Sequence, residues 1–361
     1  MRVGLIAPPW IPVPPTAYGG TEAVVDHLAR GLAAAGHDVQ LFTVGDSTCP
    51  VPRLHLHEHG AEPMGDSAAE AAHVLEAYEA LADVDIIHDH TVLGPMLALR
   101  ACPNLPPVVV TNHNPFNPTN TRIFTEIART ADVVAISKSH ARSAVDVPIT
   151  DIVHHGIDLD VYRPGPAATA GSGDYLMFMG RMCADKGVHT AVRVARETGH
   201  RLVIATKMRE ASERQYFSDC VSPLLGPDDV LHVEAPLDVR LDLLHRARAL
   251  VNPIAWREPF GLVMAEALAT GTPVLASPLG AAPEIVDHGV TGFLCHDGGA
   301  MIAAVGRLEA ISRADCRAAA VERFSMERMA RDYADLYRRI LDSRPKRAIG
   351  LSVRTVVQAA R

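Results

Sequence analysis

Two carboxylates, Glu258 and Glu266, lie eight residues apart on either side of a predicted loop-to-helix junction. Pro259 biases Glu258 towards an extended conformation, and Gly261 permits a tight turn and the close approach of a ligand. A short, alanine-rich, apolar helix is predicted to begin near Leu262 and to end before residue 270. Glu258 therefore belongs to the loop over a helix N-terminus, and Glu266 lies just over one turn inside that helix.

This arrangement predicts a site for the hydroxyl groups that flank a bound phosphate. A helix N-terminus attracts phosphate through its free N–H groups and its positive dipole end. The two carboxylates cannot bind the phosphate themselves because like charges repel, but they can accept hydrogen bonds from hydroxyls on either side of it. Ribose on one side and a sugar on the other describe a nucleotide-sugar.

A second candidate for phosphate binding is the segment Gly-Arg-Met-Cys-Ala-Asp-Lys-Gly at 180–187. It follows a predicted strand and opens a predicted helix. Arg181 and Lys186 lie around one turn, so both cationic groups can converge on a single anion. Two unrelated surface cations near a helix start are the alternative interpretation.

The residues Tyr18, Gly19 and Gly20 follow the first predicted strand after a proline-rich loop. Two glycines at a helix N-terminus allow backbone N–H groups to approach a ligand oxygen. Their spacing is not that of the G-x-G-x-x-G fingerprint, so dinucleotide binding is not supported. A plain helix-entry turn is an equally good interpretation of these residues alone.

Three histidines end predicted strands in the first half of the chain. His88 and His90 project to the same side of an extended segment, and His113 ends the following strand. Because the chain contains 18 histidines, metal ligation is a rival interpretation. The sequence contains neither the G-x-S-x-G element of serine hydrolases nor a P-loop.

Short apolar runs alternate with amphipathic stretches along the chain, a pattern that is typical of βαβ units and parallel sheets. A linker of small residues at 164–173 separates two such series. The predicted fold class is α/β, with two doubly wound halves joined near residue 165 and facing a ligand-binding cleft. The predicted strands are 3–7, 39–43, 85–88, 108–111, 133–136 and 152–154, then 176–179, 202–205, 230–233, 249–252, 274–276 and 292–294. The predicted helices are 21–35, 184–197, 237–247, 262–268 and 326–341.

The composition excludes several classes of protein. The 361 residues include 21% charged and 48% hydrophobic residues, as in soluble globular enzymes, and suffice for two domains. A net charge of −8 without a long basic run disfavours nucleic acid as a partner. Six cysteines without CxxC spacing, and no apolar run of membrane-spanning length, favour a reducing, cytoplasmic setting.

The segment 256–267 resembles the E-x7-E motif of the retaining glycosyltransferases of family 4, which have the GT-B architecture of two Rossmann-like domains. The stretches G-T-P-V at 271–274, P-E-I-V at 283–286, G-V-T-G-F at 289–293 and G-R-x3-D-K-G at 180–187 are also similar to that family. A bare E-x7-E pair is more often two solvated surface carboxylates, but these other stretches argue against that. The A-T-K turn at 205–207 departs from the glycine-containing turn of many relatives, which leaves base and diphosphate contacts there open.

The resemblance implies a catalytic set made of Arg181, Lys186, Glu258 and His113. The two cations would stabilise the leaving nucleoside diphosphate in place of a metal ion, so neither a metal nor a cofactor is expected. Glu258 and His113 would contact the donor sugar, and Glu266 would hold the ribose. Donor contacts are also implied for Gly19, Gly20, Pro259, Phe260, Gly261 and Leu262, and acceptor contacts are expected for Tyr18, His88 and His90.

The resemblance also implies an acceptor-binding domain at 1–164, a nucleotide-sugar-binding domain at 165–326, and a terminal helix of about 327–361 that packs back on the first domain. The predicted activity transfers a sugar, with retention, from a UDP-, GDP- or ADP-sugar to a hydroxyl acceptor that is a small molecule, a saccharide or a lipid-linked group. The alternatives are a nucleotide-sugar epimerase of the GT-B fold and a non-catalytic nucleotide-sugar-binding protein. A weak membrane-surface contact is considered for the basic tail at 344–361, and the sequence does not define the oligomeric state.

Overall fold

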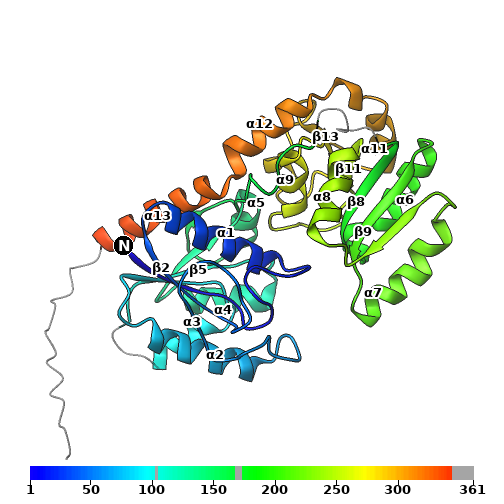
Figure 1. Cartoon of the computed structure of the whole chain (residues 1–361). Helices are drawn as coiled ribbons and strands as arrows, with labels where there is room; N and C mark the ends of the chain where they lie inside the picture. The colour runs from blue at the N-terminus through cyan, green and yellow to red at the C-terminus, as the bar shows by residue number, and fades with distance from the viewer. Residues whose placement is uncertain (102–104, 167–172, 344–361) are drawn as a thin grey trace, which may run out of the picture.

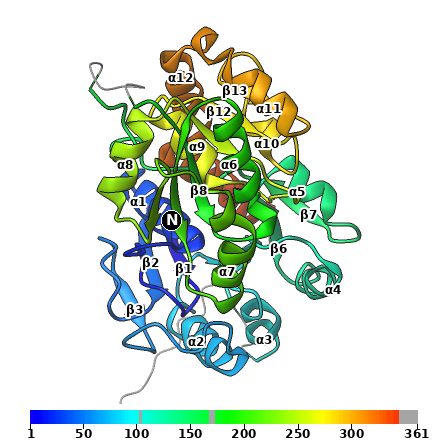
Figure 2. The ribbon, with the colours of Figure 1, turned by 90° about the vertical axis from the view of Figure 1, so that its right-hand side faces the viewer.

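The computed structural model describes residues 1–101, 105–166 and 173–343 and arranges them in two α/β lobes (Figure 1). Each lobe is built on a parallel sheet whose faces are covered by helices (Figure 2). The predicted fold class, α/β with two Rossmann-like doubly wound units, is confirmed. Part of the predicted linker, residues 167–172, and the basic tail 344–361 lie outside the described residues.

The first lobe contains a seven-stranded sheet in the order β3-β2-β1-β4-β5-β6-β7. The inner strands are buried apolar runs, as expected for parallel strands that helices cover on both faces. The strands are β1 (Arg2–Ile6), β2 (Asp38–Thr43), β3 (Arg53–His55), β4 (Ile86–Asp89), β5 (Val108–Thr111), β6 (Asp132–Ala135) and β7 (Ile149–Ile152). The helices are α1 (Gly20–Ala34), α2 (Ser67–Ala80), α3 (Gly94–Ala101), α4 (Pro118–Ile127) and α5 (Lys138–Ser143).

The second lobe contains a six-stranded sheet in the order β10-β9-β8-β11-β12-β13. Its strands are β8 (Tyr175–Arg181), β9 (Arg201–Lys207), β10 (Val230–Val233), β11 (Ala249–Asn252), β12 (Val274–Ala276) and β13 (Gly292–Leu294). Its helices are α6 (Val188–Glu197), α7 (Ala211–Tyr216), α8 (Leu237–Arg246), α9 (Leu262–Ala269), α10 (Ala282–Ile285), α11 (Gly298–Val305) and α12 (Arg313–Phe324). One apolar core connects both faces of this sheet.

The strand order reverses once in each sheet, between β1 and β4 and between β8 and β11. Ligands of doubly wound folds bind outside the carboxyl ends of the strands at such a reversal. The chain leaves β1 towards Gly19 and leaves β4 at His90, and it leaves β8 at Arg181 and β11 towards Glu258. The topology therefore delivers the predicted functional residues to the two places where this fold binds ligands.

The prediction missed eight helices, α2, α3, α4, α5, α7, α10, α11 and α12. Three further differences concern β3, β7 and the helix that begins after β8. The strand β3 was not predicted because it is a three-residue edge strand with exposed side chains and no apolar pattern. The strand β7 spans Ile149–Ile152 instead of 152–154, and its pairing with β6 contains a register irregularity. The predicted helix 184–197 is interrupted, because Gly187 adopts φ +70° between a 3-10 turn at Ala184–Lys186 and the start of α6.

The helix α13 (Met326–Ser343) returns from the second lobe and lies against α1 of the first (Figure 1). Its apolar face joins the core of the first lobe through Met329, Tyr333 and Tyr337. The close approach depends on Gly31, because a Cβ atom there would lie 2.8 Å from Ala330 Cβ. Among the described helices, none is both long and apolar enough to cross a membrane.

Replacing Gly31 with valine should separate α13 from α1 or strain the contact, since overpacking costs about 1–3 kcal/mol. We expect the free energy of unfolding, measured by urea denaturation, to fall by that amount. Ala33→Val is the matched control, because Ala33 is an exposed position on the same helix. Equal stabilities for the two variants would contradict the account of the α1–α13 contact.

Candidate functional site

The loop that follows β8 carries the predicted phosphate-binding cations Arg181 and Lys186. Gly187 closes this loop in the left-handed conformation, and a Cβ atom there would lie 2.1 Å from the carbonyl oxygen of Pro253. A hydrogen bond of 2.8 Å from Ala255 N to the carbonyl oxygen of Asp185 joins the same two segments. The loops after β8 and β11 therefore form one unit, with the N-terminus of α6 directly behind Lys186.

A buried ion pair lies at the centre of this unit. Lys186 Nζ is 2.5 Å from Glu258 Oε1, and the side chains are only 9% and 11% exposed. Lys186 Nζ also lies 5.5 Å from the centroid of the Trp256 ring. The second oxygen, Glu258 Oε2, is buried and has no hydrogen-bond partner among the described residues. A buried carboxylate oxygen without a partner is costly, so this atom is a candidate to bind a ligand hydroxyl.

The backbone around Glu258 is held from both lobes. Gly280, with φ +58°, packs so closely that a Cβ atom there would lie 2.2 Å from the carbonyl oxygen of Glu258. The same oxygen accepts a hydrogen bond of 3.0 Å from Ala281 N. From the first lobe, Ser137 Oγ donates a hydrogen bond of 2.7 Å to the carbonyl oxygen of Pro259. Gly261, with φ +99°, then turns the chain into α9.

Glu266 lies on α9 as predicted, but it already has a hydrogen-bond partner. Tyr162 Oη donates a bond of 3.0 Å to Glu266 Oε1. Burial raises the pKa of Glu266, and the charge of Arg240 and the bond from Tyr162 oppose that rise. A ribose hydroxyl bound to Glu266 would therefore share the carboxylate with Tyr162, a residue that the sequence analysis did not identify.

The glycine turn of the first lobe reaches the second lobe. A Cβ atom on Gly20 would lie 3.6 Å from Leu262 Cδ1, at the start of α9. Tyr18 is 39% exposed, but its phenol faces enough protein that partial loss of water raises its pKa, and the charges of Arg181 and Glu258 also act on it. Tyr18, Gly20 and the E-x7-E segment thus come together from opposite lobes.

A row of neutral histidines connects the first lobe to the Glu258 loop. His90 Nδ1 is 2.9 Å from His113 Nε2, and the His113 ring stacks on His155 with centroids 5.1 Å apart. The His155 ring meets Phe260 edge-on at 5.0 Å. Burial lowers the pKa of His113 to about 3 and holds that of His90 well below its usual range. Within the described residues, no three His, Cys, Asp or Glu side chains are arranged to hold a metal ion.

The position of His88 argues against the expected acceptor contact. Its side chain is fully buried, and its ring nitrogens lie 2.6 Å from Tyr337 Oη and 2.8 Å from Thr111 Oγ1. Thr111 Oγ1 is in turn 2.8 Å from Tyr333 Oη. Alternation along a strand predicts the direction of a side chain but not the arrival of α13 over it, so the sequence could not assign His88 to this internal network.

Glu284 makes a polar contact between the lobes that the sequence analysis did not predict. Its carboxylate accepts hydrogen bonds from Lys138 N at 2.8 Å and Ser139 N at 2.7 Å, at the start of α5. His154 Nε2 lies 3.0 Å from the same carboxylate. Burial opposes ionisation, but the bonds from His154 and the two N–H groups lower the pKa of Glu284 overall. In the sequence, the P-E-I-V stretch at 283–286 only marked the similarity to the family, and it did not indicate that Glu284 bonds to the start of α5.

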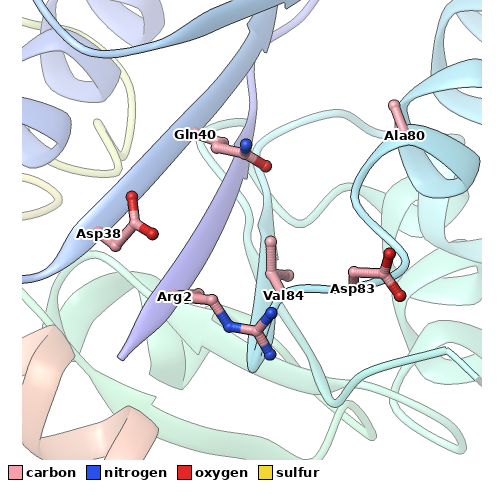
Figure 3. A pocket seen from close by; sticks show the side chains of 6 residues that line it. All are labelled: Arg2, Asp38, Gln40, Ala80, Asp83 and Val84. Carbon is pink, nitrogen blue, oxygen red and sulfur yellow. The ribbon is translucent and has the colours of Figure 1, made fainter. Parts of the chain in front are cut away.

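The surface carries two hollows, and one of them borders these elements. One lies between the lobes and is lined by Pro115, Phe116, Ser139, His140, Ser143, Arg257, Glu258 and Pro259. The other lies at the amino ends of β1 and β2 and is lined by Arg2, Asp38, Gln40, Ala80, Asp83 and Val84 (Figure 3). Ligands of this fold bind at the opposite, carboxyl ends of the strands, so we assign the candidate site to the face with Glu258 and not to the hollow of Figure 3.

Two family models match the chain, one over most of each lobe. Residues 18–161 match the family model described as Glycosyltransferase Family 4, and residues 173–310 match the model described as Glycosyl transferases group 1. The glycogen synthase of Mycobacterium tuberculosis (strain H37Rv) is 27% identical, and the match covers 78% of this chain and 80% of that protein.

Two solved structures share the arrangement of both lobes. AviGT4, a glycosyltransferase involved in avilamycin A biosynthesis, is 26% identical with a TM-score of 0.71, over 95% of this chain and 98% of AviGT4. Anabaena HepE, solved in complex with UDP-glucose, is 17% identical with a TM-score of 0.75, over 94% of this chain and all of HepE (100%).

The histidines beside the site predict a loss of stability in acid. His140 accepts from Ile136 N through Nδ1 at 3.3 Å, and its Nε2 lies 2.9 Å from the carbonyl oxygen of Asn114, so the neutral ring fits. Burial lowers its pKa to about 4, whereas an unfolded histidine titrates near 6.5. The unfolded chain therefore binds the extra proton first, and stability falls as the pH drops from about 6.5 towards 4.

His140→Gln keeps a donor and an acceptor but does not titrate. We expect the free energy of unfolding of the wild type, relative to this variant, to fall by up to about 1.4 kcal/mol per pH unit over that range. His296→Gln is the control, because His296 is exposed. Parallel stability curves for the wild type and His140→Gln would contradict a neutral, buried His140.

Proposed function

The chain belongs to the glycosyltransferases of family 4 and group 1, and we propose that it transfers a sugar from a nucleotide-sugar to a hydroxyl acceptor with retention of the anomeric configuration. The observation that carries this proposal is the Lys186–Glu258 pair at the strand reversal of the second sheet. Lys186 supplies a cation for phosphate, and the neighbouring Glu258 carboxylate has one oxygen without a hydrogen-bond partner among the described residues.

The donor is proposed to lie along the carboxyl ends of the second sheet. Arg181, Lys186 and the free N–H groups at the start of α6 would bind the diphosphate. Glu266 would accept hydrogen bonds from the ribose. The same fold holds UDP-glucose in Anabaena HepE, which supports a nucleotide-sugar donor. We propose uracil, guanine or adenine as its base.

The reaction requires one bond to form and one to break at the anomeric carbon of the donor. The acceptor oxygen would bond to that carbon on the face from which the diphosphate leaves, while the bond from the carbon to the phosphate oxygen breaks. The departing phosphate oxygen takes the proton of the acceptor hydroxyl, so no side chain need act as a nucleophile. Arg181 and Lys186 would stabilise the charge that develops on the diphosphate.

Positioning of the sugar is assigned to Glu258 and His113. Glu258 Oε2 would accept hydrogen bonds from sugar hydroxyls. His113 follows β5, and its ring stacks on His155, which in turn contacts Phe260 in the Glu258 loop. The acceptor would enter from the first lobe, past Tyr18 and His90.

The test of this function is turnover of UDP-, GDP- and ADP-sugars with a panel of sugar and polyol acceptors, read as release of nucleoside diphosphate. Arg181→Ala should lower turnover on the order of 10²–10³-fold, by analogy with other preorganised charge stabilisers. Arg193→Ala, an exposed cation on α6, is the matched control and should not change it. Activity should persist in EDTA, because the two cations act in place of a metal ion.

The configuration of the product tests the retaining step. A donor with an α-linked, gluco-configured sugar should give an α-linked product, readable from the coupling of the anomeric proton. A β-linked product would refute retention, and loss of activity in EDTA with recovery on adding manganese would refute metal independence. Donor conversion to an isomeric nucleotide-sugar without an acceptor would instead indicate an epimerase.

A further inference from the structure

Glu234 has an unusual backbone conformation at the edge of the proposed donor site. In the described part of the chain, two non-glycine residues have positive φ angles, Glu234 at 55° and Asp146 at 69°. This conformation is uncommon for residues other than Gly, Asn and Asp. It persists only where the surrounding structure imposes it, and such residues cluster at functional sites. Asp146 lies in a loop of the first lobe, whereas Glu234 directly follows β10.

The sheet register relates Glu234 to the phosphate-binding loop. Arg181 at the end of β8 pairs with Lys207 at the end of β9, and Thr206 pairs with Val233 at the end of β10. Glu234 N extends this ladder with a bond of 2.8 Å to the carbonyl oxygen of Thr206. Because neighbouring strands lie about 4.8 Å apart, the backbone of Glu234 is roughly 10 Å from that of Arg181. A nucleoside can span such a separation.

The side chain of Glu234 presents one engaged and one free oxygen. Glu234 Oε2 accepts from Arg209 Nη2 at 2.8 Å, and the side chains of Glu234 and Arg209 are 26% and 50% exposed. Glu234 Oε1 is buried and lacks a hydrogen-bond partner within the described residues. A ligand at this pair would therefore meet the N–H donors of the Arg209 guanidinium next to the free acceptor oxygen of Glu234.

The proposed ribose site borders the same surface. Helix α8 begins three residues after Glu234, and Arg240 lies in its first turn. Burial raises the pKa of Glu266, the residue assigned to the ribose, and the charge of Arg240 opposes that rise. If the diphosphate lies at Arg181 and the ribose at Glu266, the base is the donor group that still lacks a site. The carboxyl ends of β9 and β10 are the neighbouring part of the sheet to which no donor group has yet been assigned.

We propose that Arg209 and Glu234 read the donor base, with Arg209 donating to a ring carbonyl and Glu234 Oε1 accepting from the adjacent ring N–H. This inference rests on the proposed function. Uracil and guanine both carry a carbonyl beside an N–H on their pairing edge. Adenine carries an amino donor beside an unprotonated nitrogen, so it would have to turn over to match the pair. The donor is therefore a UDP- or GDP-sugar and not an ADP-sugar.

The positive φ provides a test that separates this role from a structural one. Glycine adopts such a conformation without strain, so Glu234→Gly removes the carboxylate and relieves the backbone together. Asp146→Gly is the matched control, because it gives the same backbone relief in the other lobe. The measurement is the calorimetric affinity of the full chain for UDP, GDP and ADP, with the unfolding temperature recorded for each variant.

The wild type should bind UDP or GDP at least tenfold more tightly than ADP, and Glu234→Gly should lose about tenfold of that preference. Its unfolding temperature should be unchanged or higher, and Asp146→Gly should keep the preference. Arg209→Gln, at a half-exposed position, should weaken the preference in the same direction.

An ADP affinity equal to or above the other two, or an unchanged preference in Glu234→Gly, would overturn the inference while leaving a nucleotide-binding enzyme. If none of the three diphosphates binds the wild type, the proposed function fails and the inference fails with it. The two failures are therefore distinguishable.

Discussion

The ion pair between Lys186 and Glu258 lies at the centre of the loops of the second lobe that face the first lobe. Its side chains are about nine-tenths buried, and taking two charges out of water is costly unless their geometry is good. The geometry is imposed by backbone contacts that tolerate no side chain, Gly187 against Pro253 on one flank and Gly280 against Glu258 on the other. The pair thus depends on the loops after β8, β11 and β12 being held as one unit.

The first lobe completes this arrangement through a different kind of contact. Across the interface, Ser137 Oγ donates a hydrogen bond to the carbonyl oxygen of Pro259, and Ser139 N donates one to the carboxylate of Glu284. The row of histidines also reaches Phe260. The carboxyl ends of β4 and β5, which carry His90 and His113, are themselves fixed by the buried network of His88 and Thr111 with two tyrosines of α13. A helix that closes the chain at its far end therefore supports residues that face the site.

The general fold was predictable because parallel strands covered on both faces are short apolar runs, and most of these appear directly in the sequence. The Glu258 and Glu266 positions were predictable because proline and glycine mark the loop-to-helix junction. Contacts that depend on tertiary approach were not: Tyr162 reaches Glu266 from 104 residues away, and Glu284 meets the start of α5 in the other lobe. Glu234 was also missed, since no local pattern predicts a positive φ at a glutamate.

The central claim is that Lys186 serves the phosphates and Glu258 serves the sugar, although the two are bonded to each other. The most direct test is the calorimetric affinity for UDP and GDP of Lys186→Met and Glu258→Gln. Lys186→Met should bind the preferred diphosphate at least about tenfold more weakly, because a charge-assisted bond to phosphate is lost. Glu258→Gln should bind it at least as tightly as the wild type, since it removes a negative charge beside the phosphates and frees the lysine. A comparable loss of diphosphate affinity in both variants would contradict this division of roles.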